Sequence, residues 1–205
     1  IQAQAGILLS SLSRLALKSS LTGLEFASGI PGTLGGAVTM NAGAYGGEMK
    51  DVIKSVWILD EDGKVELLDS EQLALGYRTS IIQNTKKIVL EVLMELKKGD
   101  YETSYSLIKD LTKRRQEKQP LTYPSAGSAF KRPVGYYAGK LIQDCGLKGM
   151  RVGDAQISEK HSGFIINLGN ATAKDVIQLI DQVKSRVNEI QGVDLQPEVR
   201  IVGEM

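Results

Sequence analysis

The sequence predicts an α+β fold, in which hairpin strands and separate helices share the chain without the regular strand–helix repeat of a doubly wound sheet. Two alternating, β-rich runs flank Asp60–Gly63, and a third run follows them closely. Helical patterns precede and follow these strands, separated by loops rich in glycine and proline. With 205 residues, 42% of them hydrophobic, the chain can bury one sizeable core or two modest ones.

The first half of the chain is expected to be mostly strand, with one helix. Alternation in IQAQAG at residues 1–6 indicates a strand that is already under way, so a preceding segment is expected. Residues 52–69 indicate a hairpin in which Gly63 takes a positive φ, and residues 86–99 add a third strand. A helix over 8–21 should bury one face, formed by Leu8, Leu12, Leu15 and Ala16.

The second half is expected to begin with a helix over 104–119, ended by Pro120 at a domain boundary. Residues 120–135 hold three of the five prolines and indicate an ordered loop. A short helix within 136–149 should then be closed by one of two glycines, Gly146 or Gly149. The longer helix should face inward with Leu107, Ile108 and Leu111.

The chain is expected to end with two strands and a long helix between them. Residues 162–169 and 197–204 have the composition of strands. Thr172 is placed to cap the helix, with Asp175 three residues on as the partner in a capping box. The buried stripe of this helix is expected to contain Val176, Ile177, Ile180, Val183, Val187 and Ile190.

Charge and cysteine content exclude several classes of function. Lys and Arg total 25 against 24 Asp and Glu, so no net field favours a nucleic acid, and none is expected as a partner. The single Cys145 and the single His161 cannot form an internal disulfide or a closed four-ligand zinc site, so no metal is expected. The apolar run near the start is broken by Arg14 and Lys18, which indicates a cytoplasmic protein without membrane insertion. The sequence does not indicate an oligomeric state.

The most distinctive stretch is GIPGTLGGAVTMNAGAYGGEM at residues 29–49, which contains seven glycines. Their spacing differs from the G-x-G-x-x-G of a dinucleotide fold, and no Gly-Lys-Ser/Thr of a P-loop is present. Two interpretations remain open. The glycines either form turns in a tightly packed sheet, or they leave backbone bare against an extended, partly apolar cofactor. The second is favoured by small residues between the glycines, with Asn41 and Tyr45 adding polar side chains.

Five motifs carry a resemblance to a known family: SGIPGTLGGAVTMNAGAYGGE, LGYRTS, PSAGSAFKRP, LIQDCGLKGMRVGDAQISEKHSGFIIN and QPEVRIVGE. With these motifs in this order, the chain resembles the UDP-N-acetylenolpyruvoylglucosamine reductases (MurB) over essentially its whole length. The resemblance implies part of a PCMH/VAO-type FAD-binding domain followed by a small α+β substrate-binding domain. Members carry a preceding segment with a pyrophosphate-binding loop, which is not found in this sequence. The short chain between Pro133 and Leu141 is typical of the compact subclass.

The same resemblance implies a division of the chain and a reaction. The second lobe of the FAD-binding domain would span 1–118 and the substrate-binding domain 119–195, with a strand at 196–205 returning to the active-site side. FAD would be the cofactor, and NADPH and UDP-N-acetylglucosamine enolpyruvate the substrates. The reaction would be a reduction that yields UDP-N-acetylmuramate for peptidoglycan synthesis.

The roles that the resemblance implies fall on residues of the five motifs. Ser128 would donate a proton to the substrate carbanion, while Arg78 and Glu198 would stabilise its carboxylate. Contacts to the flavin would come from Gly29, Ile30, Pro31, Gly32, Gly35, Gly36, Asn41, Ala42, Gly43, Ala44 and Tyr45. Contacts to the substrate would come from Tyr77, Lys118, Lys131 and Arg132.

Two other functions are weighed against this one. A flavin oxidase of the same superfamily would act on another substrate, but it should lack the set of Ser128, Arg78 and Glu198. A non-catalytic carrier of a UDP-sugar or a flavin would keep the binding residues without the reaction. His161 and Cys145 are expected to be structural, because the family mechanism requires neither as a catalyst.

Overall fold

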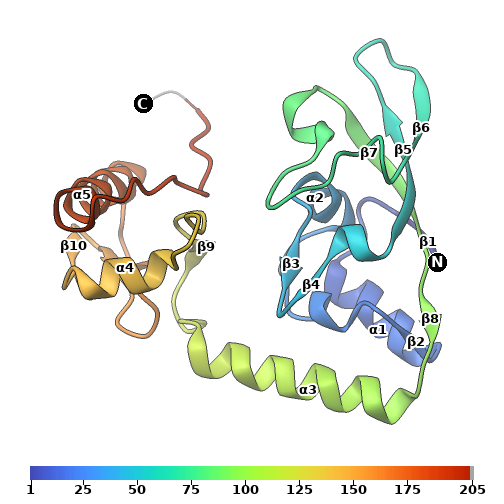
Figure 1. Ribbon diagram of the computed structural model, residues 1–205, viewed down its shortest axis with the longest axis horizontal. Coiled ribbons are helices and arrows are strands. Elements are labelled where there is room, and N and C mark those ends of the chain that lie inside the picture. The colour runs from blue at the N-terminus through green and yellow to red at the C-terminus, as the bar shows by residue number, and fades with distance from the viewer. Residues whose placement is uncertain (204–205) are drawn as a thin grey trace. The chain divides into compact units, whose positions relative to one another are not determined.

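The computed structural model describes residues 1–203, and the chain divides into two compact units. The first unit spans Ile1–Arg115, and the second begins at Gln116. Helix α3 (Tyr101–Lys118) carries the chain from the first unit into the second (Figure 1). Of the helices in residues 1–203, none is long and apolar enough to cross a membrane.

A four-stranded antiparallel sheet forms the centre of the first unit, in the order β1–β7–β5–β6. Its strands are β1 (Gln2–Gln4), β5 (Ile53–Leu59), β6 (Val65–Asp69) and β7 (Ile88–Met94). Val92 of β7 pairs with Ala3 on one side and with Val56 on the other. The predicted opening strand, hairpin and third strand are confirmed, as is the positive φ of Gly63, at +79°.

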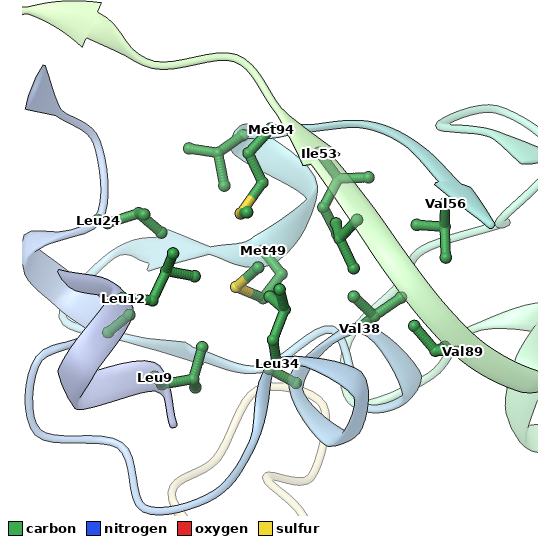
Figure 2. Close-up of a cluster of buried hydrophobic side chains, with 14 of the residues drawn as sticks. Leu9, Leu12, Leu24, Leu34, Val38, Met49, Ile53, Val56, Val89 and Met94 are labelled. Atoms are coloured by element: carbon green, nitrogen blue, oxygen red, sulfur yellow. The ribbon is translucent and has the colours of Figure 1, made fainter. Parts of the chain in front are cut away.

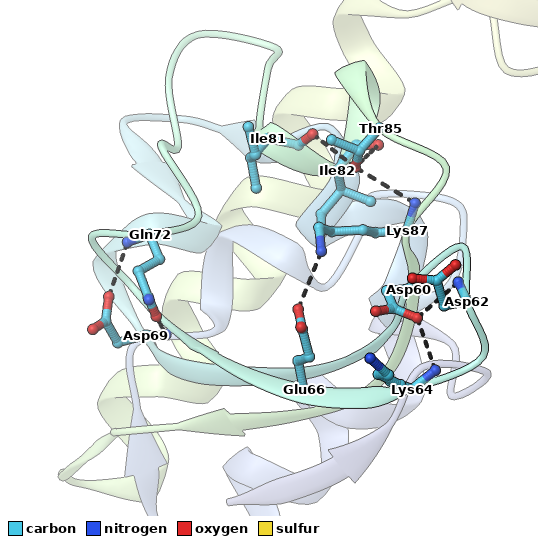
Figure 3. Close-up of polar contacts among 10 residues, drawn as sticks. All are labelled: Asp60, Asp62, Lys64, Glu66, Asp69, Gln72, Ile81, Ile82, Thr85 and Lys87. Atoms are coloured by element: carbon cyan, nitrogen blue, oxygen red, sulfur yellow. Dashed lines mark hydrogen bonds and ion pairs between the residues drawn. The ribbon is translucent and has the colours of Figure 1, made fainter.

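The turn between β5 and β6 is held by the Asp60 carboxylate. Its Oδ1 accepts hydrogen bonds from the backbone N–H groups of Asp62 and Lys64 at 2.9 and 2.7 Å (Figure 3). Further along the hairpin, Glu66 forms an ion pair with Lys87 at 3.2 Å, just before β7 begins (Figure 3). Local polar contacts therefore fix both the turn and the edge of the hairpin.

The hydrophobic core of the first unit is formed by this sheet together with helices α1 (Leu9–Lys18) and α2 (Leu34–Thr39). Leu12 of α1, Leu34 of α2 and Met49 are fully buried in it (Figure 2). Burying a side chain of this size stabilises the fold by about 1.5–3 kcal/mol. The core therefore fixes α2, and with it the glycine-rich segment, on the sheet.

The predicted inward face of helix α1 is confirmed at Leu12 and Ala16 but not at Leu8 and Leu15. Leu9 and Ala16 are buried with Leu12, whereas Leu8 and Leu15 are 53% and 52% exposed. Leu8 has extended backbone at the N-cap, so the helix and its buried stripe begin one residue later than expected. The helix also ends at Lys18, three residues before the predicted end.

The glycine-rich segment 29–49 contains regular structure that the sequence did not predict. Thr33 caps helix α2 by accepting the Gly36 N–H at 3.5 Å. The segment continues with a two-stranded ribbon, β3 (Gly43–Ala44) and β4 (Gly47–Glu48), and runs into a 3-10 turn, η2 (Met49–Asp51). Gly, Val and Thr are poor helix formers, so α2 has no propensity signal and depends on packing.

Glu25 ties helix α3 to the rest of the first unit. It begins the 3-10 turn η1 (Glu25–Ala27), next to the paired short strands β2 (Leu21–Thr22) and β8 (Lys97–Lys98). Its carboxylate accepts hydrogen bonds from Ser104 Oγ at 2.6 Å and Thr22 Oγ1 at 2.7 Å. Burial alone would raise the pKa of Glu25, but the hydrogen bonds from Ser104, Thr22 and the Gly23 N–H outweigh it and lower the pKa.

The inward face of α3 differs from the predicted one. Leu111 is buried as predicted and Ile108 is partly buried, but Leu107 is 45% exposed. Ser104 is buried instead, and the stripe of spacing four, three and four continues from Leu111 to Arg115. The last residue of this inward face is therefore a cation.

The second unit contains a four-stranded antiparallel sheet in the order β10–β11–β12–β9. Its strands are β9 (Ser125–Ser128), β10 (Arg151–Val152), β11 (Ala155–Ile157) and β12 (Phe164–Asn167). The predicted strand at 162–169 is confirmed by β12. Residues 120–135 were expected to be loop, but they contain β9. The sequence did not indicate this strand, because it forms by pairing with β12, a distant part of the chain.

Two helices complete the second unit. Helix α4 (Ala138–Asp144) ends just before Gly146, which has a φ of +70° and so closes the helix as predicted. Helix α5 (Ala173–Gln191) has the predicted capping box. Its core positions are Leu179, Ile180, Val183 and Val187, whereas the predicted Ile190 is 55% exposed because it lies in the last turn.

The predicted strand over 196–205 is not formed in the part of the chain that the structure describes. Within residues 196–203, the one β-bridge is that of Pro197 to Phe130. Residues 204 and 205 lie outside the described residues.

Candidate active site

Three glycines of the glycine-rich segment are explained by close packing within the first unit. A Cβ on Gly35 would lie 2.9 Å from the Cβ of Ala5. One on Gly43 would lie 2.7 Å from the Gly47 carbonyl oxygen, and one on Gly47 would lie 2.7 Å from the Phe26 ring. Real Cβ atoms do not approach other atoms so closely. The tight-packing interpretation therefore accounts for these three positions.

A second group of glycines faces open space. A Cβ on Gly32 would meet no atom within 4 Å, and one on Gly36 would meet only Thr33 Oγ1 at 3.7 Å. Gly29 and Pro31 are also exposed. Gly32 and Gly36 therefore leave space beside the backbone that a ligand can approach, whereas Gly29 is exposed but contacted by the Arg115 side chain.

Tyr45 lies at the tip of a tight hairpin. With Gly46 it joins β3 to β4, and the two residues have φ values of +54° and +90°. Positive φ at both central positions is typical of a type I′ turn. Tyr45 is 46% exposed, so a fixed backbone presents its ring and hydroxyl at the surface of the unit.

Asn41 is fully buried and uses its side-chain amide inside the unit. Nδ2 donates to Glu48 Oε2 at 2.7 Å and to the Gly76 carbonyl at 3.0 Å, and Oδ1 accepts the Lys50 N–H at 2.9 Å. These bonds join the glycine-rich segment to the turn that begins at Gly76. The expected contact of Asn41 with a flavin stays a prediction.

Arg78 lies in that turn, Gly76–Thr79, whose end residues exchange both backbone hydrogen bonds at 3.1 and 3.2 Å. Its guanidinium Nη2 donates to the Gly43 carbonyl at 3.1 Å, and its Cζ lies 5.2 Å from the centroid of the Tyr77 ring. Three predicted site residues, Arg78, Tyr77 and Gly43, are therefore brought together in the first unit.

Backbone strain is concentrated at the predicted site. Among the described residues, five that are not glycine have a positive φ, and three of these are Asn41, Tyr45 and Arg78. Such conformations cost on the order of 1–3 kcal/mol each and persist only where the surroundings enforce them, which is common at functional sites. This geometry points to the same three residues independently of their motifs.

One charged residue beside the glycine-rich segment was not predicted. The Arg115 side chain lies against Gly29, with Cδ and Nη1 3.2 and 3.3 Å from the position that a Cβ on Gly29 would take. Arg115 is partly buried. Burial lowers the pKa of its guanidinium, and the nearby Tyr45 raises it in part. The sequence contained one signal that could have identified Arg115: it lies four residues after Leu111, which places it on the inward face of α3.

In the second unit, Ser128 and Glu198 lie on neighbouring segments. The Glu198 N–H donates to the Ala129 carbonyl at 2.9 Å, and the Lys131 N–H donates to the Gln196 carbonyl at 2.8 Å. The C-terminal segment therefore runs beside residues 129–131. It brings the backbone of Glu198 next to Ala129, the residue that follows Ser128.

His161 is held close to this pair by backbone contacts. The Ala129 N–H donates to the Gly163 carbonyl at 2.8 Å, and His161 Nδ1 accepts the Gly163 N–H at 3.1 Å. Burial lowers the pKa of His161, a backbone hydrogen bond opposes this, and the Lys118 cation lowers it further. The imidazole is therefore neutral near pH 7, with its proton on Nε2.

The basic residues that were expected to contact the substrate lie around the same part of the unit. Lys118 is close enough to His161 for its positive charge to lower the pKa of the imidazole, and Lys131 lies beside the C-terminal segment. Arg132 is fixed by a hydrogen bond from Nε to the Tyr136 carbonyl at 3.2 Å, and its Cζ lies 3.9 Å from the Tyr137 ring centroid. The structure thus places Lys118, Lys131 and Arg132 in the second unit, and Arg78 and Tyr77 in the first.

A mostly apolar pocket of about 370 Å³ opens beside β9 in the second unit. Ser125 and Gly127 of β9 line it together with Ile165 of β12, Val176 of α5 and Val199. Within residues 1–203, no group of three or more His, Cys, Asp or Glu side chains is placed to hold a metal ion.

The glycine-rich segment fits the ring of FAD better than its phosphates. In the first turn of α2, the N–H groups of Leu34 and Gly35 donate to the Ile7 and Ala5 carbonyls at 2.9 Å each, and that of Gly36 donates to Thr33. A helix start whose donors are already used cannot cradle a phosphate. The space beside Gly32 and Gly36 and the exposed Tyr45 are instead available to a ring.

Comparisons with known proteins follow the division into two units. Residues 1–69 match a family model described as an FAD binding domain. Residues 119–202 match the model of the UDP-N-acetylenolpyruvoylglucosamine reductase C-terminal domain. The fold and the site therefore define a flavoprotein, with an FAD-binding unit followed by a second α+β unit. The predicted fold class is confirmed.

Related proteins give the family. A UDP-N-acetylenolpyruvoylglucosamine reductase of Alkaliphilus oremlandii (strain OhILAs) is 63% identical over 202 residues, 98% of this chain and 66% of that protein. One from Caldanaerobacter subterraneus subsp. tengcongensis is 56% identical over 204 residues, 100% of this chain and 68% of that protein. The crystal structure of the Thermus caldophilus enzyme (MurB) matches with a TM-score of 0.85 and 41% identity, covering 97% of this chain and 71% of that one.

The chain belongs to the UDP-N-acetylenolpyruvoylglucosamine reductase family, and it spans about two thirds of the length of the curated relatives it matches. The predicted family is therefore confirmed, and the match of residues 1–69 supports FAD as the cofactor. The roles of the individual site residues stay predictions.

Proposed function

We propose that this chain reduces the enolpyruvyl double bond of UDP-N-acetylglucosamine enolpyruvate to form UDP-N-acetylmuramate, with NADPH as reductant. The reaction would serve peptidoglycan synthesis in the cytoplasm. One observation carries the proposal beyond family membership. The C-terminal segment runs beside residues 129–131, directly after β9, so that the backbone of Glu198 lies next to the residue that follows Ser128, although the two are far apart in the sequence.

The chemistry divides between the cofactor and the side chains. Bound FAD would supply the redox chemistry, the passage of hydride from NADPH to the substrate double bond. The Ser128 hydroxyl would supply the proton that completes the reduction, at the carbon next to the substrate carboxylate. The lysines and arginine of the second unit, Lys118, Lys131 and Arg132, would bind the negatively charged diphosphate or carboxylate.

Arg78 would stabilise the negative charge that develops on the substrate. Its guanidinium is fixed by the Gly43 carbonyl and the Tyr77 ring, so little reorganisation is needed as charge develops. Glu198 would help to stabilise the enolic form of the carboxylate. We assign the FAD-binding lobe to residues 1–118, the substrate-binding domain to 119–195, and an active-site segment to 196–205.

The test compares Ser128→Ala with Ser125→Ala in the same strand, in the two half-reactions. Loss of the Ser128 proton donor should leave reduction of bound flavin by NADPH nearly unchanged. Reoxidation by the enolpyruvyl substrate should slow by about 10²- to 10⁴-fold, the usual contribution of a positioned acid. Ser125→Ala controls for distortion of the turn, since Ser125 Oγ accepts the Gly127 N–H at 3.1 Å. Equal losses in both half-reactions would rule out the assigned role.

A further inference from the structure

Arg115 is a partly buried cation that has no counter-charge among the described residues. Within residues 1–203 its guanidinium forms no ion pair and no hydrogen bond, and no carboxylate contributes to its electrostatic environment. Its neighbour Arg114 behaves differently. Arg114 is exposed and forms an ion pair with Asp110 at 2.7 Å.

Such an arrangement is unfavourable unless an anion completes it. Taking a charge out of water costs several kcal/mol, and buried charges in proteins are normally paired. An arginine cannot avoid this cost by losing its proton. The inward spacing on α3 fixes Arg115 in this position, one turn beyond the buried Leu111. The missing negative charge is therefore expected from a ligand.

The surroundings of Arg115 indicate which part of a ligand lies there. Its side chain covers Gly29 and is close to Tyr45, both in the segment that matches an FAD-binding domain. In the same segment, Gly32 and Gly36 have open space beside the backbone, whereas the first-turn N–H groups of α2 are already used. One guanidinium beside bare backbone fits the edge of a planar ring better than a diphosphate, which needs several donors.

We propose that the Arg115 guanidinium lies beside the isoalloxazine ring of bound FAD and stabilises the negative charge that the ring gains on reduction. Hydride transfer adds two electrons and one proton, so the ring gains one negative charge unless a second proton follows. A cation beside the ring then stabilises the reduced state more than the oxidised state, which raises the reduction potential. Arg115 would act directly on the ring through its charge, and the inference rests on the proposed function in that FAD is the ligand.

The first test measures the midpoint potential of bound FAD in Arg115→Gln, with Arg114→Gln as the matched control. Arg115→Gln should weaken binding of reduced FAD at least tenfold relative to oxidised FAD, which is a fall of about 30 mV for a two-electron couple. Arg115→Lys keeps the charge and should recover part of the shift. An unchanged potential, or an equal loss of affinity for both states, overturns the proposal.

The second test needs no flavin. Because the free chain carries an unpaired charge at this position, Arg115→Met should keep the packing of the aliphatic stem and leave the melting temperature unchanged or higher. A melting temperature lower by about 3 °C or more would show that Arg115 has a stabilising role inside the protein, and would overturn the proposal. If the wild-type chain fails to bind FAD, the proposed function fails, and these melting temperatures alone decide the charge argument.

Discussion

Replacing Asn41 should separate the glycine-rich segment from the Arg78 turn, and its cost can be worked out from the structure. Asn41→Ala removes two hydrogen bonds to backbone groups, worth about 1 kcal/mol each, and one to the Glu48 carboxylate, worth about 2 kcal/mol. Alanine at φ +42° adds about 1 kcal/mol of backbone strain. The first unit should therefore lose about 5 kcal/mol of stability.

The fluorescence of Trp57 provides the assay, because it is the single tryptophan and lies in β5 of the first unit. Urea unfolding should show the full loss for Asn41→Ala. Asn41→Gly should lose about 1 kcal/mol less, since glycine adopts positive φ without strain. Asn84→Ala, at an exposed asparagine of the same unit, should stay within about 0.5 kcal/mol of wild type. A loss below about 1 kcal/mol for Asn41→Ala would refute the reasoning.

Two further predictions concern packing and pH. Gly35→Ala should destabilise the first unit by about 1–3 kcal/mol, because its Cβ would lie 2.9 Å from that of Ala5. Gly36→Ala, with only Thr33 Oγ1 at 3.7 Å, should cost nothing in the free protein, and equal losses by Trp57 fluorescence would contradict the packing account. The lowered pKa of His161 means that the unfolded chain binds its proton first as pH falls. The second unit should therefore lose stability as pH falls below about 6.5, in a way that His161→Gln abolishes; identical pH dependence of thermal unfolding in the two proteins would contradict this.

Features with a local cause could be predicted from the sequence. The turn between β5 and β6 is held by Asp60, which lies within the turn. Helix α5 is capped by Thr172, and the partner in its capping box, Asp175, is only three residues further on. Helix α2 and strand β9 could not be predicted in this way. Four of the six residues of α2 are weak helix formers, and its Leu34, Ala37 and Val38 are held by the core, while β9 exists because β12 pairs with it.

The candidate site shows the same limit. Motifs gave Ser128, Arg78 and Glu198, but they did not indicate that the C-terminal segment would run beside residues 129–131 without forming a strand. They also gave the glycine-rich segment without distinguishing the packed Gly35 from the open Gly36, which depends on what lies across from each Cα. Arg115 was missed because its importance depends on the absence of a partner among the described residues, which no sequence pattern encodes.

The proposed function requires this chain to bind FAD and to use it in reducing an enolpyruvyl substrate. The most direct measurement is the visible absorbance of the purified chain with FAD under anaerobic conditions, first with NADPH and then with UDP-N-acetylglucosamine enolpyruvate. The account predicts that NADPH bleaches the flavin absorbance and that the enolpyruvyl substrate restores it. A chain that binds FAD and is bleached by NADPH, but whose absorbance does not return with that substrate, would contradict the account.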